Sequence, residues 1–187
     1  MKTLVTKRLI LRHLKLTDAP DLFAYAHKPN IGPMAGWSPH RSLQNSYNIL
    51  KLLIKEDDTW AITLKSEDRL IGTIGLHARD FYQALDNKKE LGYALDDIYW
   101  GQGIVLEAAQ AVINYGFIEI ELDEILCGHY IHNHQSKRVI EKLGFTFTHE
   151  KETEDYQKYP VTLKMYHMMR LDYLEKRFQY DNTGQKV

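Results

Sequence analysis

The sequence predicts an α/β fold in which about seven strands form a mixed, mostly antiparallel sheet flanked by about four helices. Three observations predict it. Short β-type runs separated by polar turns fill the segment from Thr59 to Asp96, which is typical of an antiparallel meander. Strand and helix patterns then alternate as far as Gly144, which indicates parallel strands joined by a crossover helix. Two further β-type runs follow and complete the sheet.

The first third of the chain has the pattern strand, helix, loop, helix. Residues 3–14 alternate between apolar and polar side chains, with Leu9 and Leu11 on one face, and predict a strand. Thr17 is the expected cap of a helix over residues 17–27. Glycines and prolines between residues 29 and 39 then break the chain into an irregular loop, and Ser42 opens a second helix that runs to about Glu56.

The rest of the chain supplies the remaining elements in order. The meander strands are TWAITLK, LIGTIGLHA and ELGYALD. Residues 103–118 have helical composition, EILCGHYI predicts a strand, and HQSKRVIEKLG predicts a helix that ends at Gly144. FTFTHEK and VTLKMYHMMRL predict the last two strands. No repeat or linker interrupts this order, so we expect one domain over residues 1–180 and a frayed tail over 181–187.

Composition excludes several classes of protein. The 187 residues carry 24 Lys and Arg against 25 Asp and Glu, a net charge of −1, so nucleic acid is not an expected partner. No apolar run approaches the ~20 residues that cross a bilayer, and Lys7, Arg8 and Arg12 interrupt the stretch where a signal peptide would be apolar. The single Cys127 excludes an internal disulfide. We therefore expect a soluble, cytoplasmic protein with no membrane partner.

The most informative stretch is ELGYALDDIYWGQGIVLEAAQ, where a strand runs through a glycine-containing turn directly into a helix. Amides in the first turn of a helix can bind a pyrophosphate, and Gly101 and Gly103 would let the backbone approach it closely. The two glycines alone fit an ordinary tight turn equally well. The turn is not a P-loop, because no Gly-Lys-Ser/Thr follows, and it lacks the third glycine of a dinucleotide fingerprint.

YWGQGIVLEA, followed further along the chain by HNHQSKRVIEKLGF, resembles the GNAT N-acetyltransferase superfamily, and within it the branch of ribosomal-protein N-terminal (alanine/serine) acetyltransferases. The order of elements matches from Thr3 to about Leu171. The resemblance implies a sheet splayed between the fourth and fifth strands, with acetyl-CoA in the opening and the acceptor on the other side. It also implies direct acetyl transfer to a primary amine, most simply a protein or peptide N-terminus.

The resemblance implies which residues bind the donor. The family's pyrophosphate-binding signature falls on Trp100, Gly101, Gln102, Gly103, Ile104 and Val105. Val105 replaces the small residue of the signature and crowds the site without removing a backbone donor. Backbone groups at Ala94 and Leu95 are expected to bind the pantetheine arm, which places the thioester beside Tyr93 and Leu95.

The second motif matches the family's Asn-x-x-Ser pattern at Asn133 and Ser136. Asn133 would hydrogen-bond the pantetheine arm, and Ser136 would point its hydroxyl at the thioester sulfur. The alternative is that Asn133 is only a helix cap and Ser136 a first-turn residue. Many members carry a proton-donating Tyr four residues after this Ser, where this chain has Ile140. Ser136 is then the first candidate for the proton donor, and a water that it orients is the second.

An amine attacks the thioester only after losing a proton, so the site needs a proton acceptor. Glu90, at the start of the fourth strand, is slightly favoured; Asp155 and His40 are the other candidates. Trp37 beside His40 could form an apolar wall, so that Trp37, His40 and Tyr93 are the expected acceptor-binding residues. The alternatives are that the two carboxylates are solvated surface charges and that Trp37 and His40 only pack their loop onto the core.

Two further patterns in the sequence concern a metal site and a second subunit. His129, His132 and His134 straddle a strand end and a helix start, so they should not share one face, and no metal site is expected. Leu171, Leu174 and Phe178 form an apolar stripe that would pack onto the chain or against a second subunit in a homodimer.

Two other functions stay open on the sequence alone. One is acetylation of a small amine such as a polyamine, an amino sugar or an amino acid, and the other is a catalytically silent acyl-CoA-binding module. The segment PNIGPMAGWSPHRS contains no acidic residue, which favours a peptide or weakly charged acceptor over a polyamine.

Overall fold

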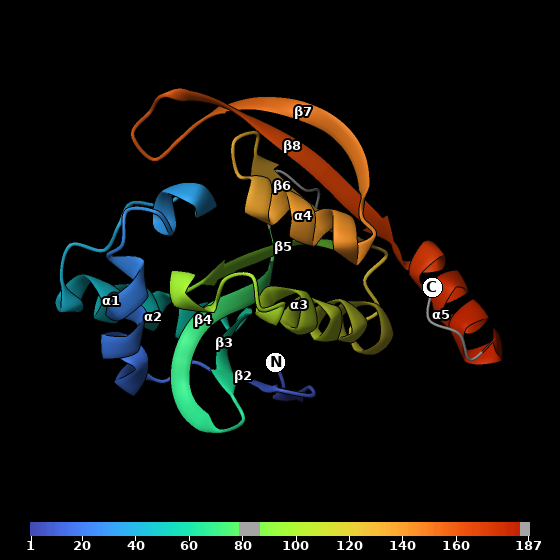
Figure 1. Ribbon diagram of the computed structural model, residues 1–187, viewed down its shortest axis with the longest axis horizontal. Coiled ribbons are helices and arrows are strands. Elements are labelled where there is room, and N and C mark those ends of the chain that lie inside the picture. Colours follow the sequence, from blue (N-terminus) through green and yellow to red (C-terminus); the bar gives the residue numbers. More distant parts are fainter. Residues whose placement is uncertain (79–86, 184–187) are drawn as a thin grey trace.

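The computed structural model describes residues 1–78 and 87–183, which form one eight-stranded sheet and five α-helices (Figure 1). The strand order is β1-β2-β3-β4-β5-β6-β8-β7, and every neighbouring pair is antiparallel except β5 and β6. The strands are β1 Leu4–Val5, β2 Leu9–His13, β3 Thr59–Leu64, β4 Glu67–His77, β5 Lys88–Leu95, β6 Glu124–Tyr130, β7 Thr146–Glu154 and β8 Pro160–Met169. The helices are α1 Ala19–Ala26, α2 Leu43–Glu56, α3 Ile104–Asn114, α4 His134–Leu143 and α5 Arg170–Thr183. The expected α/β class and mixed sheet are confirmed.

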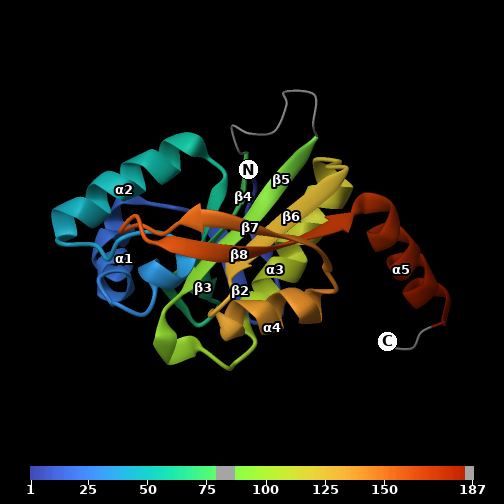
Figure 2. The same cartoon turned by 90° about the horizontal axis from the view of Figure 1, so that it is seen from above.

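The helices cover the sheet from two sides. Figures 1 and 2 show α1 and α2 grouped to one side of the central strands and α3 and α4 to the other. Alternation along β3 separates the two cores, because Trp60 and Ile62 pack beneath α3 whereas Ala61 packs beneath α1 and α2. Burial of these two apolar clusters fixes which face of each strand meets which helix pair.

β5 and β6 are paired over only three residues. The parallel ladder joins Lys88–Glu90 of β5 to Glu124–Leu126 of β6 and then stops, while β5 stays paired with β4 as far as Leu95. These are the fourth and fifth strands that the sequence predicts, so the expected splay is confirmed. From Leu91 onward, the edge of β5 that faces β6 has no ladder partner among the described residues.

Three local expectations hold at the helix ends. Ser42 caps α2 by accepting a hydrogen bond from the N–H of Asn45 at 3.1 Å. Gly144 follows α4 with φ of 82°, a left-handed conformation that glycine adopts at low cost. The helix expected over residues 103–118 begins at Ile104 and ends in a π-helical turn over Tyr115–Glu119.

Two N-terminal expectations are wrong in detail. The single strand expected over residues 3–14 is two strands, because Thr6 turns the chain and its hydroxyl accepts the N–H of Leu9 at 3.0 Å. Thr17 does not cap α1. It lies in a 3₁₀ turn over Leu16–Asp18, and α1 begins only at Ala19.

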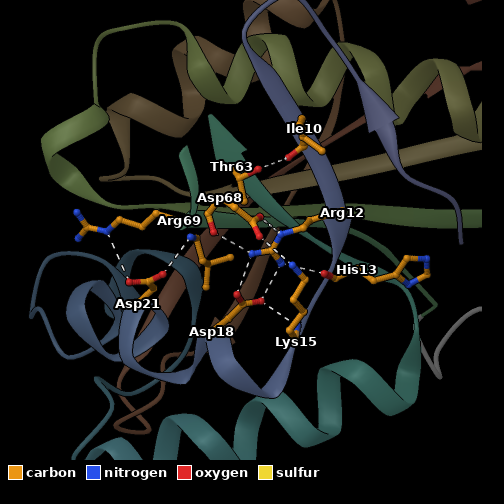
Figure 3. Close-up of polar contacts among 10 residues, drawn as sticks. Ile10, Arg12, His13, Lys15, Asp18, Asp21, Thr63, Asp68 and Arg69 are labelled. Atoms are coloured by element: carbon orange, nitrogen blue, oxygen red, sulfur yellow. Dashed lines mark hydrogen bonds and ion pairs between the residues drawn. The ribbon is translucent and has the colours of Figure 1, made fainter. Parts of the chain in front are cut away.

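Asp18 is the N-cap residue of α1, but its carboxylate binds a buried arginine and caps no amide of that helix. Both its carboxylate oxygens accept hydrogen bonds from Arg12, at 2.8 and 2.9 Å, and Arg12 also contacts Asp68 (Figure 3). Arg12 and Asp18 are 8% and 4% exposed. A buried guanidinium is tolerated only when it is paired, so this contact fixes β2 against the start of α1.

The C-terminal segment also differs from expectation. The last strand ends at Met169, and the residues after it form α5 rather than continuing the strand to Leu171. Leu171 and Phe178 are 71% and 70% exposed and do not pack onto this chain, whereas Leu174 is half-buried. The expected tail overlaps the end of α5, and residues 184–187 lie outside the described part of the chain.

None of the helices described here is both long and apolar enough to cross a membrane.

The contact between Arg12 and Asp18 can be tested by stability measurements. Replacing Asp18 by Ala leaves the buried guanidinium without its two-oxygen partner, and we expect the free energy of unfolding to fall by about 3 kcal/mol in urea denaturation. Asp68→Ala is the control, because the Asp68 side chain is 63% exposed and its loss should cost about 1 kcal/mol or less. Equal losses in the two variants would contradict this account.

Candidate active site

A cleft of about 1300 Å³ opens where β5 and β6 separate. Its walls come from β5, the turn before α3, the first turn of α4 and the loop between α1 and α2. The cleft therefore lies at the place where the sheet leaves backbone groups of β5 without ladder partners, and it joins elements far apart in the chain.

The cleft brings together nearly all residues that the sequence analysis selected. The donor-binding candidates that line it are Ala94, Leu95, Trp100, Gly101, Gly103, Ile104, Val105, Asn133 and Ser136. The acceptor and proton-transfer candidates that line it are Trp37, His40, Glu90 and Tyr93. Gln102 and Asp155 are the two exceptions.

The turn before α3 has the geometry of an anion site. Gly101 and Gly103 adopt left-handed φ values of 76° and 72°, which disfavour any residue with a Cβ. Gly103 occupies the N-cap position of α3 and has no side chain to bind the first-turn amides, unlike Ser42 at α2 and Asn133 at α4. A Cβ added at Gly101 would meet no atom within 4 Å, so the backbone there is open. The first turn of α3 is thus left for a ligand to cap.

A pair that the sequence analysis missed holds this turn in place. Glu107 accepts hydrogen bonds from the Arg8 side chain at 2.6 Å and from the Thr6 hydroxyl at 2.6 Å. Arg8 also donates to the backbone oxygen of Gln102 at 2.9 Å. The Gln102 side chain donates to the carbonyl of Ile98 at 3.1 Å and lies outside the cleft lining. Arg8 therefore ties the glycine turn to the β1–β2 turn and brings a positive charge to its edge.

Trp100 and Val105 line the cleft, and both also pack against the core. Trp100 donates its indole N–H to the Leu95 carbonyl at 2.9 Å, which fixes the turn against the end of β5. Val105 is half-buried against the core beneath α3. Its branched side chain narrows the cleft wall but leaves its own backbone N–H in the first turn of α3, which agrees with the expectation that it removes no donor.

A hydrogen bond between Tyr93 and Ser136 spans the cleft. The Tyr93 hydroxyl lies 2.8 Å from Ser136 Oγ and joins β5 to the first turn of α4. Burial raises the pKa of Tyr93, so the phenol keeps its proton at neutral pH. The sequence predicts that Tyr93 lies beside the thioester but gives no sign of this contact, because the two residues are 43 positions apart.

Asn133 uses both ends of its side-chain amide within the protein. Its Oδ1 accepts the N–H of Ser136 at 3.0 Å as the N-cap of α4, and its Nδ2 donates to the Met34 carbonyl at 3.1 Å. In the structure Asn133 is therefore the cap of α4, which was the alternative interpretation of this residue. The cap also orients the first turn that carries Ser136.

The three candidate proton acceptors lie in different surroundings. Glu90 is on β5 in the cleft wall. His40 also lines the cleft, with Nδ1 2.7 Å from the hydroxyl of buried Ser46, and burial lowers the pKa of His40, which favours its neutral form. Asp155 is not in the lining: its Oδ1 accepts the N–H groups of Gln157 and Tyr159 at 2.8 and 3.0 Å and organises the β7–β8 turn.

Trp37 forms part of both the loop packing and the cleft wall. Its ring fills the space beside Gly32, where an added Cβ would lie 2.4 Å from a ring carbon, and it sits 5.3 Å from the His40 ring. The loop is attached to the start of the α3 turn by Lys28, which pairs with Asp96 and Asp97. The packing and lining interpretations of Trp37 are therefore compatible.

Cys127 and His129, the first histidine of the run, are both buried on β6. Cys127 is 1% exposed on the cleft side of β6, and burial raises the pKa of its thiol, which disfavours a nucleophilic thiolate. His129 is buried with Nδ1 2.8 Å from the Tyr130 carbonyl. Within residues 1–78 and 87–183, no three His, Cys, Asp or Glu side chains are grouped to hold a metal ion.

Comparisons with known proteins agree with this geometry. Residues 8–146 match the model of the acetyltransferase (GNAT) domain family. The chain is 31% identical to the protein named Uncharacterized N-acetyltransferase p20 of Bacillus licheniformis, over 92% of this chain and 99% of that one. It is 35% identical to the ribosomal-protein-serine acetyltransferase of Escherichia coli K12, over 42% of each chain. The crystal structure of a GNAT-family acetyltransferase from Bacillus anthracis matches with a TM-score of 0.80 at 22% identity, over 90% and 99% of the two chains, which establishes the fold alone.

Proposed function

Because the chain belongs to the acetyltransferase (GNAT) domain family and is an acetyl-CoA-dependent N-acetyltransferase, we propose that its acceptor is the N-terminal amine of a protein or peptide. The observation that carries this proposal is the charge of the cleft. Among the described residues that line it, Glu56 and Glu90 are the only carboxylates, whereas Arg41, Arg138 and Lys142 are basic. Such a wall repels a polyamine and suits an amine that carries a single positive charge.

The partial likeness to a ribosomal-protein-serine acetyltransferase supports a ribosomal acceptor. A flexible N-terminus needs only an open groove around its first residues, and the loop with Trp37 and His40 offers an aromatic wall beside β5. A ribosomal acceptor would also place the enzyme in the cytoplasm, as the sequence leads us to expect.

The donor fits the residues present. Acetyl-CoA supplies an activated acetyl group on a thioester, together with a pyrophosphate. The first-turn amides of α3 and the open backbone at Gly101 suit the pyrophosphate, and the edge of β5 beyond Glu90 suits the amides of the pantetheine arm. The turn at residues 100–105 and the β5 residues Ala94 and Leu95 are therefore the proposed donor site.

Ser136 is the proposed proton donor to the departing sulfur. Its hydroxyl lines the cleft on the first turn of α4, and the hydrogen bond to Tyr93 fixes its direction. Tyr93 keeps its own proton at neutral pH and can replace the proton that Ser136 gives away. This arrangement supplies from β5 a phenol that the family usually carries on α4, at the position of Ile140. The buried thiol of Cys127 supports direct transfer over an acyl-enzyme.

An acceptor screen tests the proposed function. We expect labelled acetyl-CoA to acetylate peptides with Ala or Ser at a free N-terminus, and not the same peptides with a blocked N-terminus and an internal Lys. Spermidine, glucosamine and free amino acids are the parallel small acceptors. Preference for one of these would contradict the peptide assignment, and absence of transfer to every amine would favour a silent acyl-CoA-binding module.

Replacing Gly103 by Val should weaken acetyl-CoA binding about 10-fold or more, because a Cβ strains the left-handed backbone and crowds the phosphate-facing turn. Isothermal titration calorimetry measures the dissociation constant. The matched control is Gly144→Val, which puts the same side chain at a similar φ of 82° outside the cleft lining. Unchanged affinity in Gly103→Val, or equal weakening in both variants, would refute the phosphate assignment.

Replacing Ser136 by Ala should lower kcat about 100-fold with little change in the KM for acetyl-CoA, because only the proton transfer is lost. Tyr93→Phe removes only the hydroxyl and should lower kcat by a smaller factor, about 10-fold. Steady-state kinetics measures both, with Ser38→Ala as the control for a serine elsewhere in the cleft wall. A normal kcat in Ser136→Ala would remove Ser136 as the proton donor.

A further inference from the structure

A histidine and an aspartate that the sequence analysis did not select form a pair at the cleft wall. His77 is the last residue of β4 and lines the cleft, and Asp58 immediately precedes β3. His77 Nδ1 lies 3.0 Å from Asp58 Oδ2, and the two side chains are 24% and 19% exposed. A carboxylate bound to one ring nitrogen fixes the orientation of an imidazole and leaves the other nitrogen for chemistry.

The glycines of β4 and β5 show where the ring lies. Gly75 and Gly92 face each other in the β4–β5 ladder. A Cβ at Gly75 would lie 2.5 Å from His77 Cε1 and 2.7 Å from Nε2, and one at Gly92 would lie 3.1 Å from Nε2. The imidazole therefore occupies space that side chains at these positions would fill. Its Nε2 reaches across β4 to Gly92, the residue beside Tyr93, on the face of the sheet that carries α1 and α2.

The proton of the imidazole is placed by Asp58. Burial works against ionisation of this carboxyl, but hydrogen bonds from His77 and from the Thr59 hydroxyl at 2.9 Å outweigh it, and the pKa of Asp58 is lowered. Asp58 is therefore an anion at neutral pH. The neutral ring then donates its Nδ1 hydrogen to Asp58 and carries a lone pair on Nε2. A base that faces the cleft needs this lone pair.

Other charged groups also face His77. Glu90 is its partner in the β4–β5 register, and Glu56 at the end of α2 lines the same cleft. Lys89, from β5, lowers the pKa of Asp58, as His77 does. An acceptor ammonium that enters the cleft therefore meets Glu56 and Glu90 in the lining as well as the Asp58–His77 pair.

We propose that His77, oriented by Asp58, is the general base that takes the proton from the acceptor amine. This inference rests on the proposed function, since it concerns the same cleft, but it holds for any primary amine. His77 Nε2 accepts one proton of the ammonium, and the freed lone pair forms the C–N bond as the C–S bond breaks. Ser136 protonates the departing sulfur, the second proton of the nitrogen returns through water to the Ser136–Tyr93 pair, and His77 releases the first proton to solvent.

The test compares His77→Asn with a matched control. We expect kcat/KM for the amine to fall about 100-fold and its acidic limb to disappear, while the dissociation constant for acetyl-CoA stays unchanged. His167→Asn is the control, because His167 Nδ1 lies 2.8 Å from Glu124 in a similar pair outside the cleft lining, and it should leave the profile intact. Added imidazole should restore part of the rate in His77→Gly, which a merely structural role would not allow.

Asp58 is a positioning residue, and its replacement should change the pH–rate profile in a different way. Asp58→Asn removes the anion that favours the imidazolium, so the acidic limb should move to lower pH while kcat falls by about 10-fold. Gly92→Ala gives a variant that keeps every polar group. Its methyl would lie 3.1 Å from the ring and displace Nε2, so it should lower kcat without abolishing folding.

The two proposals fail in different ways. If His77→Asn keeps the wild-type rate and acidic limb, or if Glu90→Gln removes that limb while His77→Asn retains it, His77 is not the base and the peptide acceptor still stands. If the wild-type chain acetylates a small amine but no peptide, the acceptor assignment is wrong and the same His77 comparison is made with that amine. Complete absence of acetyl transfer would overturn both.

Discussion

The early end of the β5–β6 ladder is the constraint on which the rest of this structure depends. Three paired residues hold the strands together at one end, and beyond Glu90 they separate. β5 keeps its shape there because β4 pairs with it from His77 back to Gly72. Unpaired backbone groups inside a protein need partners, so the exposed edge of β5 is costly unless a ligand or water occupies the gap. The cleft and its acyl-donor chemistry follow from this one departure from regular pairing.

The donor end of the cleft relies on backbone dipoles more than on charged side chains. α2 and α4 are capped by Ser42 and Asn133, whereas α3 begins at a glycine with no capping side chain. The Arg8–Glu107 pair fixes that turn from outside, and most of its charge is neutralised within the pair. This division explains how a protein with a net charge of −1 can hold a polyanionic donor, because oriented amides attract phosphate without any excess of basic residues.

Adjacent residues of β5 serve opposite faces of the sheet. Tyr93 packs toward the core beneath α3 and meets Ser136, whereas Ala94 packs toward α1 and α2, on the same face as Gly92 and the His77 ring. Side chains alternate along a strand, so one short segment can carry the proposed proton donor for the sulfur on one face and make room for the proposed base on the other. The glycine at position 92 is as important to this arrangement as the polar residues, since it makes room for the imidazole.

The sequence by itself determined the fold class, the order of elements, the cap at Ser42, the glycine at the end of α4 and the turn at Gly101 and Gly103. These depend on periodicity, capping and φ preferences, which are local properties of the chain. Only the tertiary structure decided that Asp18 binds Arg12, that α5 follows β8, that Tyr93 meets Ser136, and that Asp58 orients His77. Most of these contacts depend on strand register and on how helices pack across the sheet. Local sequence patterns do not predict the strand register, because the register is fixed by the burial of two separate apolar clusters.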